Sequence, residues 1–405
     1  MPPTNNKKIK VLYIDHAAAY PEEQKKFDYL AQQPELEIIL VRPDKWSQVG
    51  RNENFASHHT NSAYKTVFAK ATFNGFRHRS FFTNEIGRVF REFQPDIIHL
   101  FEEANTFFSL QAFLLRRLFS KNSKLIFDNF QNILFEHVGY KFYRLYDFIE
   151  KLVFNDAACA TVRYSGSRDF LLKRKFTKPI LELPWGTDIH LFSPQDGSQI
   201  RKKNKLDCFT MAYIGRLEED KGILLLIEAL AKVKHDFKLI VIGGGRAEPK
   251  MNELISKYSL ESGVQHLGYV PHRELPEYYS AVDCVVVPTI TTSGCKEQFG
   301  RVIVEAMACG TPVIGSTSGA IPSVIGETGL VFEDNNVDDL TEKITKMITS
   351  PELHQHYSEV VRKRVINNYS LDKFAQNCVS IYLNILATPH ISVGNKTFEV
   401  SEHAK

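Results

Sequence analysis

The sequence predicts an α/β protein made of two doubly wound domains that face each other across a cleft. The chain has 405 residues, more than one hydrophobic core usually covers. Short β-rich apolar runs alternate with amphipathic stretches almost from end to end, which is typical of parallel sheets wrapped by helices. The alternation restarts after residues 183–207, which are rich in turn residues and then in charges. Open parallel sheets bind ligands beyond the carboxyl ends of their strands, so we expect the site in the cleft.

We expect the first domain to cover residues 1–188 and an interdomain linker to cover residues 189–207. Amphipathic stretches such as PEEQKKFDYLAQQ and FFTNEIGRVFREF separate its strands. The runs that predict strands are IKVLYI (9–14), LEIILV (36–41), DIIHLF (96–101), KLIFDNF (124–130) and CATV (159–162).

The second domain is expected over residues 208–368, followed by a helix and tail (369–405) that we expect to pack back on the first domain. Six apolar runs predict its strands. They are FTMAYIG (209–215), KLIVIG (238–243), VQHLGYV (264–270), CVVVP (284–288), TPVIGS (311–316) and LVF (330–332).

Composition narrows the class of protein. Apolar residues make up 43% and charged residues 24%, which argues against a disordered or fibrous chain. Residues 1–190 carry 27 Lys and Arg against 21 Asp and Glu, and the remainder carries 23 against 26. The basic first half fits an anionic partner, either a phosphorylated substrate or a bilayer surface, and equally fits an ordinary solvated surface.

The six cysteines are widely spaced and form no C-x-x-C pair, so neither a zinc site nor a disulfide framework is indicated. They are typical of reduced thiols in a cytosolic protein, and we expect a cytoplasmic location. The N-terminal stretch has too few apolar residues for a signal peptide, and no apolar run reaches the roughly 18 residues of a membrane span.

Two loops of the second half suit an anionic ligand. In AYIGRLEEDKGILLLIEAL (212–230) a strand ends at Gly215, and Arg216 and Lys221 precede an apolar helix, where cations and free amides favour a diphosphate. In VIGGGRAEP (241–249), Gly243 and Gly244 let backbone approach a ligand closely. A solvated surface remains the alternative for both loops.

Neither half has a G-x-G-x-x-G with its downstream acid, which disfavours a dinucleotide-dependent dehydrogenase.

The stretch CKEQFGRVIVEAMACGTPVIG (295–315) contains a charged residue within an apolar segment. Glu305 is the one charged residue of the apolar segment 302–308, and a buried carboxylate without a partner costs several kcal/mol. It could accept hydrogen bonds from a vicinal diol such as a ribose. Glu297, at the mouth of the same helix, could do so for hexose hydroxyls.

The chain resembles the retaining glycosyltransferases of the family-four type, the glycosyl transferases of group 1. The matching elements are GRLEEDKG (215–222), EQFGRVIVE (297–305), AMACGTPVIGS (306–316), SGAIPSVI (318–325), GLVF (329–332) and the linker LPWGTDIHLFSP (183–194). They cover most of the second half in the expected order. The resemblance implies the GT-B arrangement, with a Rossmann-like acceptor-binding domain followed by a Rossmann-like nucleotide-sugar-binding domain.

The resemblance implies roles for individual residues. Arg216 and Lys221 would hold the donor diphosphate, Glu297 the transferred sugar and Glu305 the ribose. The catalytic candidates are therefore Arg216, Lys221 and Glu297, and the donor-binding candidates are Gly215, Gly243, Gly244, Tyr269, Val270, Phe299, Gly300, Arg301 and Glu305. Tyr269 and Val270 mark the expected place of the nucleobase, and His272 nearby is as well explained by an exposed turn as by a contact.

The first half departs from the family pattern. Its first loop has Ala17 to Ala19 where members commonly have glycines, and Asp128 or Asn129 takes the approximate place of a family histidine. FEEAN (101–105) and FDNFQN (127–132) resemble a subset of these enzymes. The acceptor-side candidates are Glu103, Asp128, Asn129, Gln131 and Asn132. Helix caps and loop hydrogen bonds explain the same residue types.

The family implies a retaining reaction, in which the acceptor attacks from the face of the leaving group. No D-x-D motif is present, and Arg216 and Lys221 can take the place of a metal, so we expect no metal and no cofactor besides the nucleotide diphosphate sugar. The expected partners are this donor and a glycan or lipid-linked acceptor in polysaccharide or glycoconjugate biosynthesis, with no nucleic acid. The nucleobase, the sugar, the acceptor and the oligomeric state are left open.

Residues 65–93 and 112–119 mix aromatic with basic side chains. Such a face suits peripheral contact with the inner face of a membrane, and core-facing helices with extended arginines explain it as well. Two other functions stay open: an enzyme of the same fold that makes a small soluble glycoside or sugar phosphate, and a noncatalytic subunit that binds sugar nucleotides.

Overall fold

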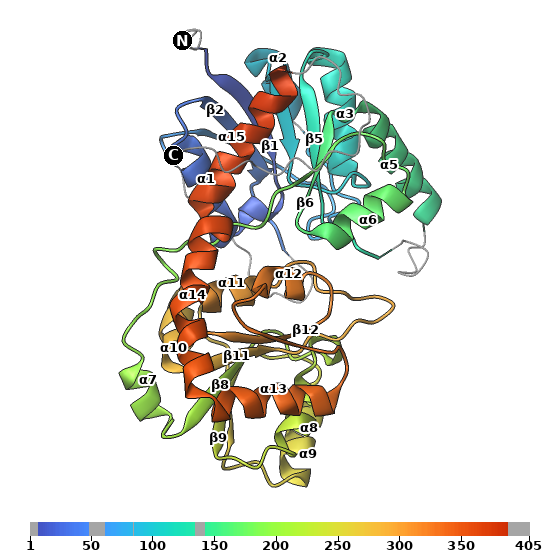
Figure 1. Ribbon diagram of the computed structural model, residues 1–405. Coiled ribbons are helices and arrows are strands. Elements are labelled where there is room, and N and C mark those ends of the chain that lie inside the picture. The colour runs from blue at the N-terminus through green and yellow to red at the C-terminus, as the bar shows by residue number, and fades with distance from the viewer. Residues whose placement is uncertain (1–6, 48–60, 84, 134–141, 388–405) are drawn as a thin grey trace. The chain divides into compact units, whose positions relative to one another are not determined.

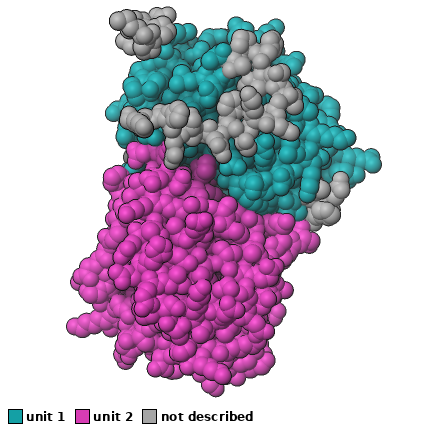
Figure 2. All heavy atoms as spheres, in the orientation of Figure 1, with its two compact units in different colours: residues 1–183, 374–405 teal, residues 184–373 magenta. Residues whose placement is uncertain are grey.

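The computed structural model describes residues 7–47, 61–83, 85–133 and 142–387, and every structural statement below refers to these ranges. The chain divides into two compact units (Figure 1, Figure 2). Unit 1 comprises Met1–Leu183 and Phe374–Lys405, and unit 2 comprises Pro184–Lys373. The expected linker (189–207) therefore belongs to unit 2, where it contains the short helix α7 (Ser198–Lys203).

Unit 1 is a parallel seven-stranded sheet with the order β3-β2-β1-β4-β5-β6-β7. The chain reverses its direction of winding between β1 and β4, so loops at the carboxyl ends of these two strands lie side by side. The strands are β1 (Ile9–Ile14), β2 (Leu36–Pro43), β3 (Lys65–Ala69), β4 (Ile97–Leu100), β5 (Lys124–Asn129), β6 (Cys159–Val162) and β7 (Ile180–Glu182). The strands β3 and β7 were not predicted from the sequence.

Helices cover both faces of this sheet, and apolar side chains from β1, β4 and β5 fill the core between the layers. The described helices of unit 1 are α1 (Pro21–Ala31), α2 (Ile86–Phe93), α3 (Phe107–Phe119), α5 (Tyr143–Asp156) and α6 (Ser165–Lys173). Thr106 caps the start of α3, because its side-chain oxygen accepts a hydrogen bond from the amide of Ser109 at 3.2 Å. This cap fixes where the preceding loop ends.

The long C-terminal helix α15 (Leu371–Ala387) contributes to the core of unit 1. Its Tyr382 is fully buried, and its hydroxyl lies 2.9 Å from the hydroxyl of Tyr13 and 2.6 Å from Nδ1 of His99. Residues of the two ends of the chain therefore stabilise one core.

Unit 2 repeats the design with a parallel six-stranded sheet of order β10-β9-β8-β11-β12-β13. The strands are β8 (Phe209–Ile214), β9 (Phe237–Ile242), β10 (Val264–Gly268), β11 (Cys284–Val287), β12 (Val313–Ser316) and β13 (Leu330–Phe332). The helices besides α7 are α8 (Ile223–Leu230), α9 (Glu248–Lys257), α10 (Leu275–Ala281), α11 (Arg301–Ala308), α12 (Ile321–Ile325), α13 (Val337–Thr349) and α14 (Pro351–Tyr369). The winding reverses between β8 and β11, which brings the loops after these strands together.

All six cysteines are free thiols. Among the helices of the described ranges, none combines the length and the apolar character needed to cross a bilayer.

Candidate active site

The loop after β8 packs against the glycine-rich turn after β9. The amide of Gly215 donates to the carbonyl of Ile242 at 3.0 Å, and the amide of Leu217 donates to the carbonyl of Gly244 at 2.9 Å. Gly243 has a φ of 128°, and a Cβ there would lie 1.9 Å from the carbonyl oxygen of Gly215. The turn therefore needs glycine at Gly243 so that the two backbones can touch. Gly244 has no atom within 4 Å of its would-be Cβ, so that position is open.

Lys221 and Glu297 form the central ion pair of unit 2. Their Nζ and Oε2 atoms lie 2.7 Å apart, and Thr289 donates its hydroxyl to the same carboxylate oxygen at 3.1 Å. The side chains of Lys221 and Glu297 are 22% and 15% exposed, so the pair reaches solvent. The structure thus brings together two catalytic candidates that lie 76 residues apart in the sequence.

Two glycines hold this pair in place. Gly222 follows Lys221 with a φ of 74°, and a Cβ there would lie 1.8 Å from the carbonyl oxygen of Pro288. Gly319 has a φ of 57°, and a Cβ there would lie 2.0 Å from the carbonyl oxygen of Glu297. Both backbones approach too closely for any other residue, so the loops that carry Lys221 and Glu297 are fixed.

Arg216, the third catalytic candidate, has an exposed side chain. Its carbonyl oxygen accepts a hydrogen bond from the hydroxyl of Tyr213 at 2.7 Å, which fixes the backbone of the loop. Cys295, near Lys221, has its pKa raised to about 11 by burial and by a hydrogen bond with Asp220. This thiol is therefore neutral at physiological pH and is not a nucleophile there.

The structure shows what Glu305 contacts in the second turn of α11. Its side chain is 7% exposed, and Tyr279 donates its hydroxyl to Oε2 at 3.0 Å. Nε2 of His272 lies 2.9 Å from Oε1. Burial, and next the neighbouring Glu305, raise the pKa of the Tyr279 hydroxyl far above its ordinary value, so it stays a donor. The protein itself partners this carboxylate. His272 begins a 3-10 turn (His272–Glu274) and contacts Glu305, and its contact with a nucleobase stays a prediction.

The other donor-side candidates differ in exposure. Phe299 is 5% exposed and packs edge-on against Tyr369 at 5.7 Å between ring centroids, so its side chain is part of the core. Gly300, with a φ of 81°, starts α11. The guanidinium of Arg301 lies 5.8 Å from the ring centroid of Trp185. Tyr269 is 77% exposed at the end of β10, and Val270 is half-buried.

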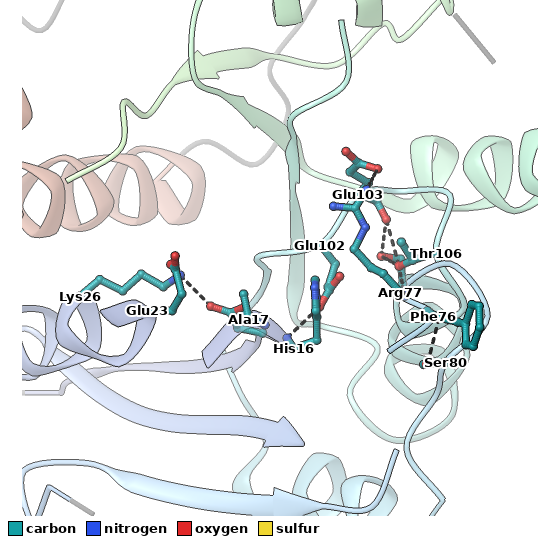
Figure 3. A network of polar contacts seen from close by, with 12 residues as sticks. His16, Ala17, Glu23, Lys26, Phe76, Arg77, Ser80, Glu102, Glu103 and Thr106 are labelled. Carbon is teal, nitrogen blue, oxygen red and sulfur yellow. Dashed lines mark hydrogen bonds and ion pairs between the residues drawn. The ribbon is translucent and has the colours of Figure 1, made fainter. Parts of the chain in front are cut away.

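In unit 1 the structure joins two of the acceptor-side candidates. Nε2 of Gln131 donates to Oε2 of Glu103 at 2.8 Å. Arg77, which the sequence did not single out, donates to the same oxygen at 2.9 Å (Figure 3). Glu103 is 2% exposed, and both Gln131 and Arg77 donate to one oxygen of this buried carboxylate.

The remaining acceptor-side candidates have structural partners. Asp128 is 1% exposed and bonds to Arg163, to Thr161 and to Nε2 of His99. Nδ2 of Asn129 donates to the carbonyls of Gln131 at 2.9 Å and Ser167 at 3.2 Å. Nδ2 of Asn132 donates to the hydroxyl of Tyr164 at 2.7 Å. Hydrogen bonds within the loops and the core were the alternative explanation for these residue types, and the contacts agree with it. Acceptor binding by these three residues stays a prediction.

A second cluster of unit 1 was missed by sequence reasoning. The backbone amide of His16 donates to Oε1 of Glu102 at 2.9 Å, and Nδ1 of His16 lies 2.6 Å from the same oxygen (Figure 3). His16 follows β1 and Glu102 follows β4, and these two strands are neighbours in the sheet. Their positions after neighbouring strands are the sequence signal that could have predicted the contact.

Ligand atoms of Asp15, His16 and Glu102 lie within 4.8 Å of one another, a spacing that a metal ion could use. All three residues are already engaged within the protein, however. Lys26 lies 2.7 Å from Oδ2 of Asp15, the amide of Ala17 donates to Oδ1 at 2.8 Å, and His16 engages Glu102. The buried lysine supplies the positive charge, and the donor set does not fit a metal.

Comparison with known proteins agrees with this architecture. A family model described as glycosyl transferases group 1 matches residues 196–364. A sucrose-phosphate synthase from Thermosynechococcus elongatus superimposes with a TM-score of 0.70 at 20% identity, covering 94% of this chain and 100% of that one. HepE from Anabaena, solved in complex with UDP, gives a TM-score of 0.69 at 16% identity, covering 93% and 100%. The fold is that of the GT-B glycosyltransferases.

Among curated relatives, the capsular polysaccharide biosynthesis glycosyltransferase CapM of Staphylococcus aureus is 30% identical over 267 residues, 61% of this chain and 67% of CapM. This chain belongs to the group 1 glycosyltransferase family. It spans about half the length of other curated relatives that it matches, 51% and 47% in two cases.

Proposed function

We propose that this protein is a retaining, metal-independent glycosyltransferase. It moves a hexose-type sugar from a nucleotide diphosphate sugar to a glycan or lipid-linked acceptor. The observation that carries the proposal is the partly exposed Lys221–Glu297 pair at the mouth of α11, in the region that matches the family model. The description of CapM, which names capsular polysaccharide biosynthesis, and the UDP bound to HepE support this class of donor and acceptor.

The reaction breaks the anomeric C–O bond of the donor, and the nucleoside diphosphate leaves with the electron pair. The acceptor hydroxyl forms the new C–O bond on the same face of the sugar, and its proton passes to an oxygen of the departing diphosphate. Lys221 and Arg216 stabilise the negative charge that builds on this leaving group. Backbone amides at the start of α8 and α11 add positive potential.

Glu297 has two roles in this proposal. It orients Lys221 through the 2.7 Å contact, and its carboxylate accepts hydrogen bonds from hydroxyls of the transferred sugar. Glu305 lies in the second turn of α11 and accepts hydrogen bonds from the ribose, with Tyr279 and His272 holding its orientation.

We expect at least one sugar nucleotide from a panel of UDP-, GDP- and ADP-sugars to raise the melting temperature of the full chain. Ligand at 100 times its dissociation constant stabilises a protein by about 2.7 kcal/mol, a readily measured shift. The shift should persist in EDTA and disappear in Glu305→Ala.

The same donor should be hydrolysed or transferred by the wild type and not by Glu297→Ala. A shift without turnover would favour a noncatalytic subunit, and no shift at all would contradict the proposal.

We also propose that unit 1 contacts an anionic bilayer through the outer surfaces of α3 and α5. Leu118 and Phe148 on these helices are 69% and 58% exposed, and Phe73 in the loop before α2 is 65% exposed. Arg116 and Arg117 of α3 both pair with Asp156 of α5, so the two helices form one surface. Apolar side chains beside arginines suit a surface with anionic lipids, where a lipid-linked acceptor would reside.

The double variant Leu118→Asp with Phe148→Asp is expected to lose binding to vesicles because it removes apolar area and adds negative charge at the contact. Cosedimentation with vesicles of phosphatidylglycerol and phosphatidylcholine measures the effect. The control is Leu383→Asp with Leu386→Asp on α15, which changes two other exposed leucines of unit 1. Equal binding by both double variants, or no binding by the wild type, would argue against this surface.

A further inference from the structure

The carbonyl group of Gly243, in the glycine-rich turn after β9 (residues 243–245), is held by a side chain from the edge strand β10. Nε2 of His266 lies 2.7 Å from this carbonyl oxygen. Because a carbonyl oxygen can only accept, Nε2 carries the proton and donates. The amide of Gly243 donates in turn to the carbonyl of Gly268 at 2.8 Å. Both polar groups of Gly243 are therefore bonded to β10.

The regular pairing of β10 with β9 is interrupted at this point. His266 pairs with Val241 and Gly268 pairs with Ile242, so β10 has one residue more than β9 between the two pairs. A bulge of this kind leaves a residue unpaired and re-aims the side chains beside it. The ladder is therefore weakened next to the turn, and the imidazole of His266 adds a hydrogen bond where the regular pairing stops.

The ring of His266 is also held at its second nitrogen. Nδ1 lies 3.5 Å from Oε1 of Glu248, in the first turn of α9. The side chains of His266 and Glu248 are 21% and 40% exposed, so this longer contact contributes little to stability. It helps to orient the ring, and the 2.7 Å hydrogen bond to Gly243 is the interaction that acts on the turn.

The hydrogen bond to Gly243 decides where the amide of Gly244 points. The carbonyl of one residue and the amide of the next lie in one planar peptide unit, and in a trans peptide they point in opposite directions. Every peptide bond of the described residues is trans. The carbonyl of Gly243 points to His266, so the amide of Gly244 points away from β10. Two adjacent glycines would otherwise let this peptide turn over at little cost.

The next peptide of the turn is fixed from the side of the β8 loop. The carbonyl of Gly244 accepts from the amide of Leu217 at 2.9 Å, which fixes the direction of the Gly245 amide. A Cβ at Gly245 would lie 2.3 Å from the carbonyl oxygen of Leu217, so the loop that carries Arg216 touches the turn. Among the described residues, none accepts a hydrogen bond from the amide of Gly244 or Gly245. Two directed amides beside the Arg216 loop suit an anionic ligand.

We propose that His266 is a positioning residue of the donor site. By fixing the peptide between Gly243 and Gly244, it directs the amide of Gly244 to the diphosphate of the nucleotide sugar. His266 itself contacts neither the ligand nor the reacting atoms. The role of the amide in donor binding rests on the proposed function, whereas the control of the peptide by His266 does not.

The first test measures the binding of UDP, GDP and ADP to the full chain by isothermal titration calorimetry. His266→Phe keeps a ring and loses the donor nitrogen. The Kd of the nucleotide that binds should rise about tenfold, the usual effect of losing one hydrogen bond to a charged group. His266→Gln places an amide nitrogen near the position of Nε2 and should recover most of the affinity. With the sugar nucleotide, KM should rise more than kcat falls, because the diphosphate is bound before and after the bond breaks.

The matched control is His354→Phe. Nε2 of His354 lies 2.8 Å from the carbonyl oxygen of Asp283, so this variant removes the same kind of bond in the same unit. Asp283 directly precedes β11, at the end of the sheet opposite the glycine-rich turn, and nucleotide affinity should stay at the wild-type value. His266→Leu takes the place of His266→Phe if the latter does not fold. If the His266 variant binds nucleotide as tightly as the wild type, or if His354→Phe weakens binding equally, the inference is overturned.

Crystal structures of the wild type, His266→Phe and His266→Gln separate this inference from the proposed function. We expect the carbonyl of Gly243 to turn away from β10 in His266→Phe and to keep its direction in His266→Gln. A turned peptide in a chain that binds no nucleotide would remove the proposed function and leave the control of the peptide by His266 standing. A peptide that keeps its direction in His266→Phe, in a chain that binds nucleotide, would overturn this inference alone.

Discussion

Lys221→Ala is expected to lower kcat for donor hydrolysis or transfer by about 10²–10³-fold. Removing one preorganised group that stabilises developing negative charge typically costs this much in kcat, about 3 kcal/mol. The ammonium of Lys221 is preorganised because Glu297 holds it at 2.7 Å and Gly222 fixes the backbone behind it. Initial rates with the donor found in the thermal-shift panel measure the loss, and KM for the donor should rise less than kcat falls.

The matched control is Lys232→Ala in the same unit. Lys232 also forms a close ion pair, at 2.6 Å with Asp338, but both side chains are mostly exposed. Surface pairs of this kind contribute little, so kcat and stability should stay near the wild-type values. If Lys221→Ala turned over as fast as Lys232→Ala, the assignment of Lys221 to the leaving group would be wrong.

Most of the fold could be predicted from the sequence because buried parallel strands are continuous apolar runs. The two strands that were missed lie at the edges of the sheet of unit 1, where one flank has no neighbouring strand. The strand β7 has only three residues, and β3 has the sequence KTVFA, which was grouped with the aromatic and basic stretch that follows. Edge strands need less apolar character, so periodicity detects them poorly.

The donor side shows what motifs can and cannot predict. Lys221 and Glu297 were each identified by their motifs, but nothing local to either residue predicts their contact. The contact depends on β8 and β11 being neighbours in the sheet and on the close approaches at Gly222 and Gly319. For Glu305, the sequence indicated a charged residue in an apolar helix, and we expected the ribose of the donor to be its partner. Tyr279 and His272, 26 and 33 residues away, already partner it.

The same limit applies to contacts between the loops of unit 1. The order of strands in the sheet, which places β1 beside β4, decides that His16 meets Glu102. The resemblance of FEEAN made Glu103 a candidate, and nothing in that motif predicts that its neighbour Glu102 contacts His16. Residue type alone could not predict that Asp128 pairs with the buried Arg163.

Asp128→Ala is expected to destabilise unit 1 by about 3–5 kcal/mol, because it leaves the guanidinium of Arg163 buried without its partner. The side chains of Arg163 and Asp128 are 3% and 1% exposed, and Thr161 and His99 complete the network. Urea denaturation measures the loss, and hydrogen exchange of the β5 and β6 amides locates it. The control is Glu92→Ala, which breaks an exposed pair with Arg88 at 2.8 Å and should change stability by less than about 1 kcal/mol.

The pH dependence of this network has a definite sign. Burial alone would raise the pKa of Asp128, but Arg163 and the hydrogen bonds from His99 and Thr161 outweigh burial and lower it. A carboxyl whose folded pKa lies below its unfolded value, about 3.9, contributes stability above that pH and loses it as the pH falls through the folded pKa. The stability of the wild type should therefore decline below about pH 4, and Asp128→Asn, which cannot titrate, should decline less there. If Asp128→Ala instead kept the stability of the wild type, the assignment of Asp128 to a stabilising ion pair with the buried Arg163 would be wrong.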